Sequence, residues 1–450
     1  MRGMNLAILI LPGLLAGISP AGAQQPPLSA GTQGADDNTS EGRWSVHIQA
    51  TSIGQHHGAF PSLYEGENSL PPHPENRVSL TTTFFLGFRV NKHVELVVNP
   101  EIAGGKGFGM VTGIAGFTNG EIPRVSGATP KLYPARAYVR TVWALGPETE
   151  FIDGEANQIA GRIPAKRITT VTGKFAVTDY FDNNTYSHDP RKQFMNWSLM
   201  YNGAWDYPAD TRGYTIGTME ELALRNWSLR MAQVMEPTTP NGPAFDARIA
   251  KNRGDVVEWE RRYTPMGRFG ALRILGFANR ERSGTYRQAI LADGLTDIES
   301  TRRDGTLKYG FGVNMEQSIT PEIGVFGRYG WNDGKTESWA FTQIDRSASG
   351  GVSLNGNLWK RKNDHIGIGG VRNYISGDHR NFLAHGGLGF IIGDSRLDHY
   401  RPEGMTEAYY SWRATKEWTI TAGFQHIQNP AYNADRGPVS VASIRLHWER

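Results

Sequence analysis

Segments in which apolar and polar residues alternate recur along most of this chain. Successive side chains of a β-strand point to opposite sides, so such a segment has two different faces. The last ten residues separate in this way, with Ala442, Ile444, Leu446 and Trp448 on one face and Ser443, Arg445 and His447 on the other. One face suits lipid and the other suits water. Repeated around a closed sheet, the pattern predicts an all-β fold, a transmembrane antiparallel β-barrel with a wet interior.

The clearest pair of strands lies between residues 78 and 101. Apolar residues occupy every second position from Val78 to Val90, Asn91-Lys92 forms a short turn, and the alternation resumes at Val94. This arrangement predicts a hairpin whose tight turn lies on the periplasmic side, where barrel turns are short. Further strands are expected at 44–51, 136–141, 308–316, 325–331 and 418–425. Two polar or glycine-rich stretches, 54–76 and 103–133, are expected to be loops, and the second is a candidate to fold into the pore.

The first 23 residues have the features of a secretory signal peptide. Arg2 supplies a positive start, residues 6–18 are apolar but too short to span a bilayer, and Ala21-Gly22-Ala23 forms a cleavage site. Residues 24–41, rich in Pro, Gly, Ser and Gln, are expected to be a flexible periplasmic lead-in, and residues 42–450 one barrel domain. Removal of 23 of the 450 residues leaves a chain that fits 16 strands at roughly 25 to 27 residues per strand with its connection.

Composition narrows the class of protein further. After residue 23 no apolar run approaches the roughly 20 residues that a membrane-spanning helix needs, so a helical membrane protein is excluded. The chain has no cysteine, which excludes disulfides and thiol chemistry, and a net charge of +3 without the basic blocks that bind nucleic acid. The aromatic residues Tyr409, Tyr410, Trp412 and Trp418 surround one short turn and are expected to form part of an interfacial girdle.

Charged residues share the phase of the polar face. An arginine facing lipid at the bilayer midplane costs about 2–4 kcal/mol, so these side chains are expected to face water inside the barrel. Guanidinium donors, carboxylate acceptors and aromatic rings together suit sugars, and the presence of both charge signs favours neutral solutes. An open alternative is that the charges only pair with each other and stiffen the wall. The candidate channel-lining residues are Arg136, Tyr138, Arg140, Glu95, Asn99, Glu101, Arg328, Gln425 and Arg445.

Several blocks carry a family resemblance that covers roughly residues 42–450. They are Ala115-Gly-Phe-Thr-Asn-Gly-Glu121, Ala135-Arg-Ala-Tyr-Val-Arg140, Asp179-Tyr-Phe-Asp-Asn-Asn-Thr-Tyr186, Asp189-Pro-Arg-Lys-Gln-Phe-Met-Asn-Trp197, Asn202-Gly-Ala-Trp-Asp-Tyr-Pro-Ala-Asp210, and an ending made of Gln425, Asn429-Pro-Ala-Tyr-Asn433, Asp435-Arg-Gly-Pro438 and Arg445-Leu-His447. In this order they resemble the carbohydrate-selective porin family, the OprB type.

The resemblance implies a 16-stranded outer-membrane porin that admits mono- or oligosaccharides by passive diffusion. It also implies a constriction made of charged residues and inward-folded loops, for which Arg136, Tyr138 and Arg140 are the best candidates. The expected partners are permeating sugars, outer-membrane lipid and lipopolysaccharide, and the barrel-assembly machinery. Barrels of this kind usually end in an aromatic residue that this machinery reads, whereas Trp448 lies two residues before the end of this chain.

The sequence gives little support for a metal site or for catalysis. The spacing of Asp179, Asp182 and Asp189 does not match a calcium loop. Glu258 and Glu260 share one strand face, whereas the catalytic carboxylates of a glycosidase flank a bond from opposite sides. No metal, cofactor or catalytic residue is therefore expected. Two alternatives stay open: an outer-membrane barrel enzyme acting on lipid or glycan, and a soluble secreted sugar-binding β protein.

Overall fold

The computed structural model describes residues 42–122, 127–291 and 294–450. Within these ranges, sixteen antiparallel strands close into a barrel in which each strand pairs with its neighbours in sequence and the last strand pairs with the first. The predicted signal peptide (1–23) and lead-in (24–41) lie outside the described residues. The described residues contain no helix that is both long and apolar enough to span a membrane.

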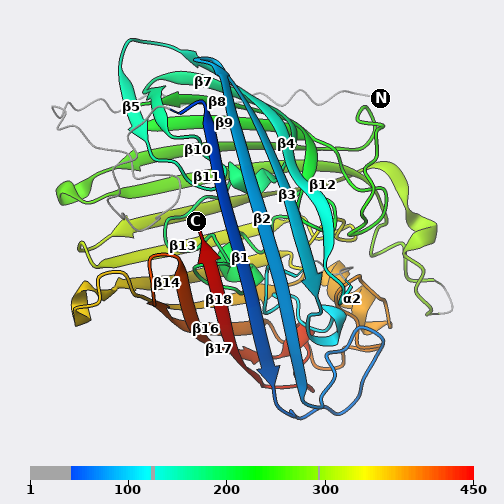
Figure 1. Ribbon diagram of the computed structural model, residues 1–450. Helices are drawn as coiled ribbons and strands as arrows, with labels where there is room; N and C mark the ends of the chain where they lie inside the picture. Colours follow the sequence, from blue (N-terminus) through cyan, green and yellow to red (C-terminus); the bar gives the residue numbers. More distant parts are fainter. Residues whose placement is uncertain (1–41, 123–126, 292–293) are drawn as a thin grey trace.

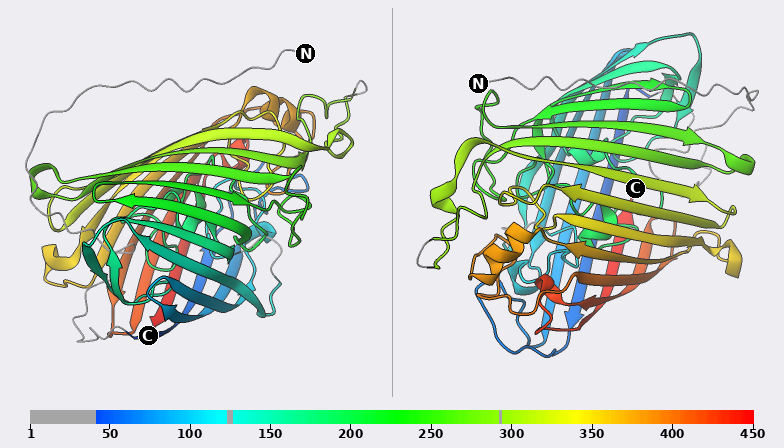
Figure 2. Two further views of the ribbon diagram at one scale, coloured as in Figure 1. Left: turned by 90° about the horizontal axis from the view of Figure 1, so that it is seen from above. Right: turned by 180° about the vertical axis from the view of Figure 1, so that it is seen from behind.

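Sequence alternation determines which strands form the barrel wall (Figure 1). The wall strands are β1 (Trp44–His57), β2 (Glu75–Asn91), β3 (Val94–Gly105), β4 (Lys131–Ala144), β7 (Arg167–Phe175), β8 (Thr215–Leu224), β9 (Trp227–Val234), β10 (Arg253–Tyr263), β11 (Gly270–Ser283), β12 (Arg303–Ser318), β13 (Ile323–Asn332), β14 (Arg346–Asn355), β15 (His365–Tyr374), β16 (Glu403–Arg413), β17 (Trp418–Gln428) and β18 (Val439–Glu449). They run obliquely around the barrel axis, as barrel closure requires (Figure 2).

The two ends of the barrel differ in the length of their connections. The end that holds residue 450 has mostly short turns, such as the predicted one between β2 and β3, together with the small hairpin of β5 (Thr149–Ile152) and β6 (Gly161–Pro164). The other end carries the long loops, which contain α1 (Trp197–Met200) and α2 (Gly377–Ala384). Short 3-10 turns lie at Phe108–Met110, Val177–Asp179, Pro265–Gly267, Glu299–Thr301, Gly356–Trp359 and Pro430–Tyr432.

The outer face of the wall is apolar, as the alternation predicts. Val78 and Ile444 are each 60% exposed and Leu80 is 39% exposed, whereas Arg445, between Ile444 and Leu446, is 1% exposed and points inward. The loops predicted at 54–76 and 103–133 are shorter than expected, because β1 continues to His57 with Gln55 and His57 on its inner face, and β3 continues through Ala103 to Gly105. The girdle prediction was wrong for Tyr409, which has the inward phase and packs against Phe194, 5.1 Å between ring centroids.

Candidate functional site

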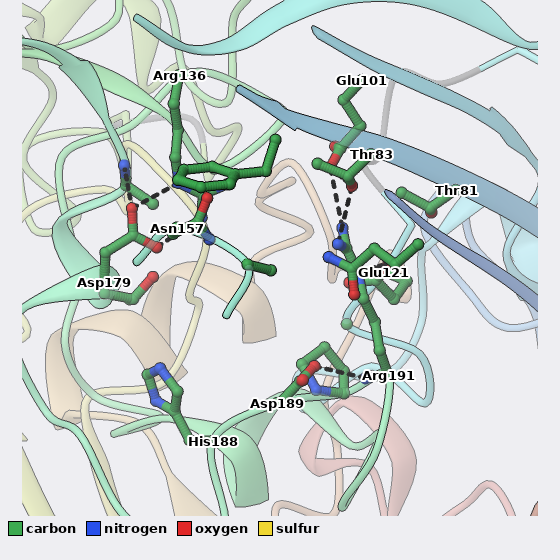
Figure 3. A pocket seen from close by; sticks show the side chains of 18 of the residues that line it. Thr81, Thr83, Glu101, Glu121, Arg136, Asn157, Asp179, His188, Asp189 and Arg191 are labelled. Carbon is green, nitrogen blue, oxygen red and sulfur yellow. Dashed lines mark hydrogen bonds and ion pairs between the residues drawn. The ribbon is translucent and has the colours of Figure 1, made fainter. Parts of the chain in front are cut away.

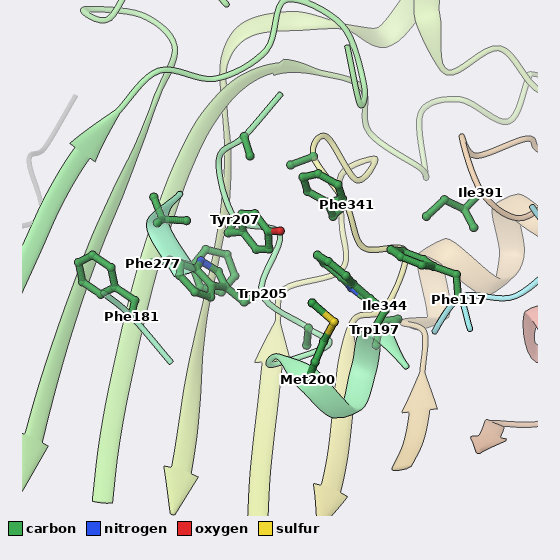
Figure 4. Close-up of a cluster of buried hydrophobic side chains, with 14 of the residues drawn as sticks. Phe117, Phe181, Trp197, Met200, Trp205, Tyr207, Phe277, Phe341, Ile344 and Ile391 are labelled. Carbon is green, nitrogen blue, oxygen red and sulfur yellow. The ribbon is translucent and has the colours of Figure 1, made fainter. Parts of the chain in front are cut away.

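Two long loops enter the barrel and fill much of its interior. They are residues 106–130, between β3 and β4, and residues 176–214, between β7 and β8; residues 123–126 of the first are outside the described ranges. Figure 4 shows the aromatic and aliphatic cluster that they build with the loop between β13 and β14. Trp197 stacks on Phe117 at 4.9 Å and on Phe341 at 5.1 Å between ring centroids. The interior is therefore a packed plug beside a narrower passage.

Carboxylates on the inner wall hold these loops by their backbones. Glu403 accepts hydrogen bonds from the amides of Ala115 (2.9 Å) and Gly116 (2.8 Å). Glu407 accepts them from Met195 (2.8 Å) and Asn196 (2.9 Å) in the same way. These hydrogen bonds are buried, and a hydrogen bond in the low-dielectric interior is stronger than one in water. The inward carboxylates thus position the loop segments that shape the passage.

Three of the predicted lining residues have this anchoring role. Arg328 donates to the carbonyl oxygens of Leu199 (3.0 Å) and Ser187 (2.6 Å) and pairs with Asp182. Arg445 donates to the carbonyls of Pro190 (2.7 Å) and Gln193 (2.8 Å). Gln425 donates to the carbonyl of Thr118 at 2.9 Å. All three point inward, but the loops cover them, and they do not line the cavity described next.

A cavity of about 790 Å³ follows the wall of β1 to β4. This volume is within the range of small-molecule sites, about 300–1,000 Å³. Its lining extends from Glu449 and Arg450 at the short-turn end, past the 153–158 segment, to Tyr207 and Phe341 among the long loops. Among the predicted residues, Glu101, Arg136, Tyr138 and Arg140 line it, while Glu95 and Asn99 lie behind them in the wall.

One side of the cavity is built on β4. Arg136 binds Asp179, at the start of the second inserted loop, through two bonds of 2.7 Å and 2.5 Å (Figure 3). Arg140 donates to Glu95 through Nε at 2.7 Å, and Glu95 also accepts from Arg89 at 3.0 Å. Each guanidinium is a rigid fork with five donors, so these pairs hold its plane in place and leave other N–H groups for a solute.

The facing side is built around Arg191, which sequence reasoning missed. Arg191 bridges the wall and a loop: it donates to Glu101 on β3 (3.0 Å), to Thr83 on β2 (2.9 Å) and to Glu121 of the first inserted loop (2.7 Å), as Figure 3 shows. Burial raises the pKa of Glu121, and the neighbouring Arg191 opposes that shift. The only sequence signal for Arg191 is its position in the family-like block 189–197, because it belongs to no alternating segment.

The cavity lining combines equal numbers of basic and acidic residues with one aromatic flank. Among its described lining residues, seven are basic (Arg136, Arg140, Arg191, Lys192, Arg212, Arg413, Arg450) and seven acidic (Glu101, Glu121, Asp153, Glu155, Asp179, Asp189, Glu449). His188 adds no charge near neutral pH, because burial lowers its pKa to about 4. The rings of Trp197, Tyr207 and Phe341 form one flank, with Tyr207 and Phe341 stacked at 5.1 Å. The passage thus offers aromatic surface and fixed hydrogen-bonding groups, with equal numbers of basic and acidic side chains.

The carboxylates considered for catalysis or metal binding, Glu258, Glu260, Asp179 and Asp182, form ion pairs with arginines. Glu258 and Glu260 share one strand face as predicted, and that face is the inner one; Arg230 lies 3.1 Å and 3.3 Å from them in a buried ion network. Asp179 forms an ion pair with Arg136, and Asp182 forms one with Arg328. Within the described ranges, no three or more His, Cys, Asp or Glu residues are arranged as a metal site.

Comparisons with known proteins agree with this geometry. The family model described as "Carbohydrate-selective porin, OprB family" matches residues 75–449. The fold is similar to the high-pH structure of Pseudomonas putida OprB, with a TM-score of 0.66 and 13% identity over 90% of this chain and 94% of that one. It is also similar to the outer membrane channel DcaP of Acinetobacter baumannii, with a TM-score of 0.51 and 8% identity over 90% of this chain and 97% of that one. No curated protein sequence matches significantly.

Proposed function

The chain belongs to the carbohydrate-selective porin family of the OprB type, and we propose that the cavity along β1 to β4 is where this porin selects its solutes. The family and the fold are those of a channel rather than an enzyme, and they imply a bacterial outer-membrane location. The proposed solutes are neutral mono- or oligosaccharides that diffuse passively. The proposed selecting residues are Arg136, Arg140 and Arg191 with the ring flank of Trp197, Tyr207 and Phe341.

The equal number of basic and acidic lining residues carries this proposal. A passage with a net charge attracts one sign of ion and repels the other, whereas a balanced one favours neither. Guanidinium N–H groups and carboxylate oxygens still hydrogen-bond hydroxyl groups, which act as donors and acceptors at once. The apolar face of a sugar ring fits against an aromatic face, so a sugar uses both kinds of wall.

Sugar flux and ion selectivity test the proposal together. Purified protein in liposomes should admit small neutral sugars, and planar-bilayer recording should show only weak discrimination between potassium and chloride. Sugars should reduce the ion current in a concentration-dependent manner as they occupy the cavity. Strong ion selectivity with no current block by any sugar would contradict the assignment.

We also propose that the outer wall binds lipopolysaccharide at the long-loop end. Arg253 and Arg280 face each other across β10 and β11, and each lies 3.0 Å from Asp255. The exposed Arg282 follows on the same face, just beyond the lipid-facing Leu307, which is 44% exposed. Arginine forks suit phosphate groups at a membrane surface. Loss of lipopolysaccharide retention in Arg280→Ala/Arg282→Ala would support this contact, and unchanged retention would refute it.

Export and assembly complete the proposal. Residues 1–23 are proposed to direct the chain to the periplasm and to be cleaved after Ala23, with 24–41 as a lead-in and 42–450 as the barrel domain. The strand β18, with Trp448 near its end, is proposed as the segment that the assembly machinery reads. N-terminal sequencing of the mature protein and the outer-membrane yield of Trp448→Ala test these two steps separately.

A further inference from the structure

The connection between β4 and β7 is the longest at the short-turn end of the barrel. It comprises residues 145–166, whereas the other wall connections at this end, all within the described ranges, have two to nine residues. Its two arms are the strands β5 and β6, and residues 153–158 between them line the cavity. Two inserted loops enter the barrel from the long-loop end, and this third segment reaches the same cavity from the opposite end.

The tip of this connection, residues 153–158, rises to the level of Arg136. Asn99 of β3 pairs with Arg136 in the sheet register, and its amide donates to the side-chain oxygen of Asn157 at 2.5 Å. In Figure 3, Asn157 lies on the same side of the cavity as Arg136. Glu155 and Gln158 exchange backbone hydrogen bonds of 3.1 Å and 3.0 Å, and Asn157 between them has a φ of 70°, a left-handed conformation in which asparagine is enriched. The tip is therefore a tight turn fixed to the wall beside the constriction.

The chain that follows the tip is packed against the inner face of β2. Ile159 is 1% exposed and fills the space over Gly87, where a Cβ would lie 2.7 Å from the Ile159 side chain. Gly161 lies against the guanidinium of Arg89, two positions closer to the turn between β2 and β3. The segment thus descends along the inner wall, and apolar packing keeps its tip inside the lumen.

Charged residues line the other side of the opening at this end. They include Lys192 of the second inserted loop and Glu449 of β18, which form an ion pair at 2.5 Å. Burial raises the pKa of Glu155 to about 7, and the charge of Lys192 opposes this shift, so the tip lies within electrostatic reach of that pair. Asp153 and Glu155 are also two of the seven acidic residues that line the cavity.

We propose that the tip is the part of the constriction that sets the size limit for solutes at the short-turn end of the pore. The inference rests on the proposed function, because it concerns the same path for sugars. A solute that passes Arg136 then passes between the tip and the Lys192–Glu449 pair. The tip narrows this path, and its carboxylates contribute to the charge balance, because the described lining without them would hold seven basic and five acidic side chains.

Replacement of residues 153–160 by Asn-Gly tests the effect on size. Ile152 pairs with Gly161 at the end of the β5–β6 hairpin, so a two-residue Asn-Gly turn can close it. This shortened variant keeps every strand of the barrel wall. It should conduct ions severalfold better than the wild type and admit longer oligosaccharides into liposomes. Its potassium-to-chloride permeability ratio should fall severalfold at about pH 8.5, where Glu155 of the wild type is ionised.

Two sets of variants separate charge from size. Asp153→Asn/Glu155→Gln should show a similar fall in the permeability ratio and keep the wild-type size limit for sugars. The chain has no cysteine, so Ala156→Cys places a single thiol at the tip, and Asn226→Cys places one in the short turn between β8 and β9 at the same end. A bulky uncharged maleimide should lower the conductance of Ala156→Cys severalfold and leave that of Asn226→Cys unchanged, because only Ala156 lines the cavity.

Two results would overturn the proposal. If the shortened variant folds and has the conductance and size limit of the wild type, the tip does not narrow the path. If labelled Ala156→Cys conducts as well as the unlabelled protein, solutes pass elsewhere, and this measurement decides the matter even when the shortened variant does not fold. Failure of the proposed function is distinguishable, since it requires that no sugar enter or block the wild type, whereas the ion conductance of the variants still tests the tip.

Discussion

Removal of the Arg191 guanidinium should turn the nearly unselective passage into a cation-selective one. The described lining residues balance seven basic against seven acidic side chains, and Arg191 faces the cavity between Glu101 and Glu121. Arg191→Ala leaves one net negative charge beside the path of a permeating ion. At a separation of about 8 Å, a unit charge is worth about 0.5–2 kcal/mol for an effective dielectric constant between 80 and 20. Because the same charge attracts potassium and repels chloride, its energy enters the potassium-to-chloride permeability ratio twice, and that ratio should rise roughly 6- to 1,000-fold.

Reversal potentials across a potassium chloride gradient measure this ratio directly. The effect should be largest at low ionic strength and should collapse near 1 M salt, where the screening length falls to about 3 Å. It should also weaken on acidification, because burial raises the pKa of Glu121, and that carboxylate loses its charge as the pH falls through the raised value. Arg191→Lys, which retains the charge, should keep the wild-type ratio.

A double variant that restores the charge balance of the cavity separates the effect of charge from that of size. Arg191→Ala/Glu121→Gln removes one charge of each sign, so its permeability ratio should return to the wild-type value although the cavity is wider. If Arg191→Ala leaves the ratio unchanged in a folded barrel, or if the double variant is as cation-selective as the single one, charge balance does not control permeation here. A difference in electrophoretic migration between unheated and heated samples verifies that each variant has folded.

Four further outcomes are expected. Trp197→Ala should weaken sugar block of the ion current about fivefold, since an aromatic contact contributes about 1 kcal/mol, while leaving the potassium-to-chloride ratio unchanged. Arg140→Ala should raise single-channel conductance and relax sugar selectivity without unfolding the barrel; unaltered conductance and flux would exclude Arg140 from the constriction. Glu403→Gln should loosen the first inserted loop and add gating noise to current traces, because the amide has one acceptor oxygen in place of two for the N–H groups of Ala115 and Gly116, and each hydrogen bond contributes about 0.5–1.5 kcal/mol. Ile444→Arg should destabilise the barrel in lipid vesicles by about 2–4 kcal/mol if this position is near the midplane, and the inward-facing Ser443→Ala is the control that denaturant unfolding should find nearly neutral.

The amino-acid sequence alone was sufficient to predict the wall of this protein. Period-two alternation depends only on which neighbours face lipid and which face water, and each strand carries that information locally. The hairpin around Asn91-Lys92, the outward Val78 and Ile444 and the inward Arg328 and Arg445 followed from phase alone. The number of strands followed from chain length and was confirmed at sixteen within the described residues.

Only the tertiary structure decided which inward residues line the passage. Phase places Arg136 and Arg445 on the same side of the wall, but the inserted loops cover Arg445 and leave Arg136 open to the cavity. Those loops have no periodicity, because their conformation depends on carboxylates such as Glu403, 288 residues away from the amide of Ala115 that it binds. Arg191 and Trp197 acquire their roles from these long-range contacts, and no local pattern in the chain encodes them.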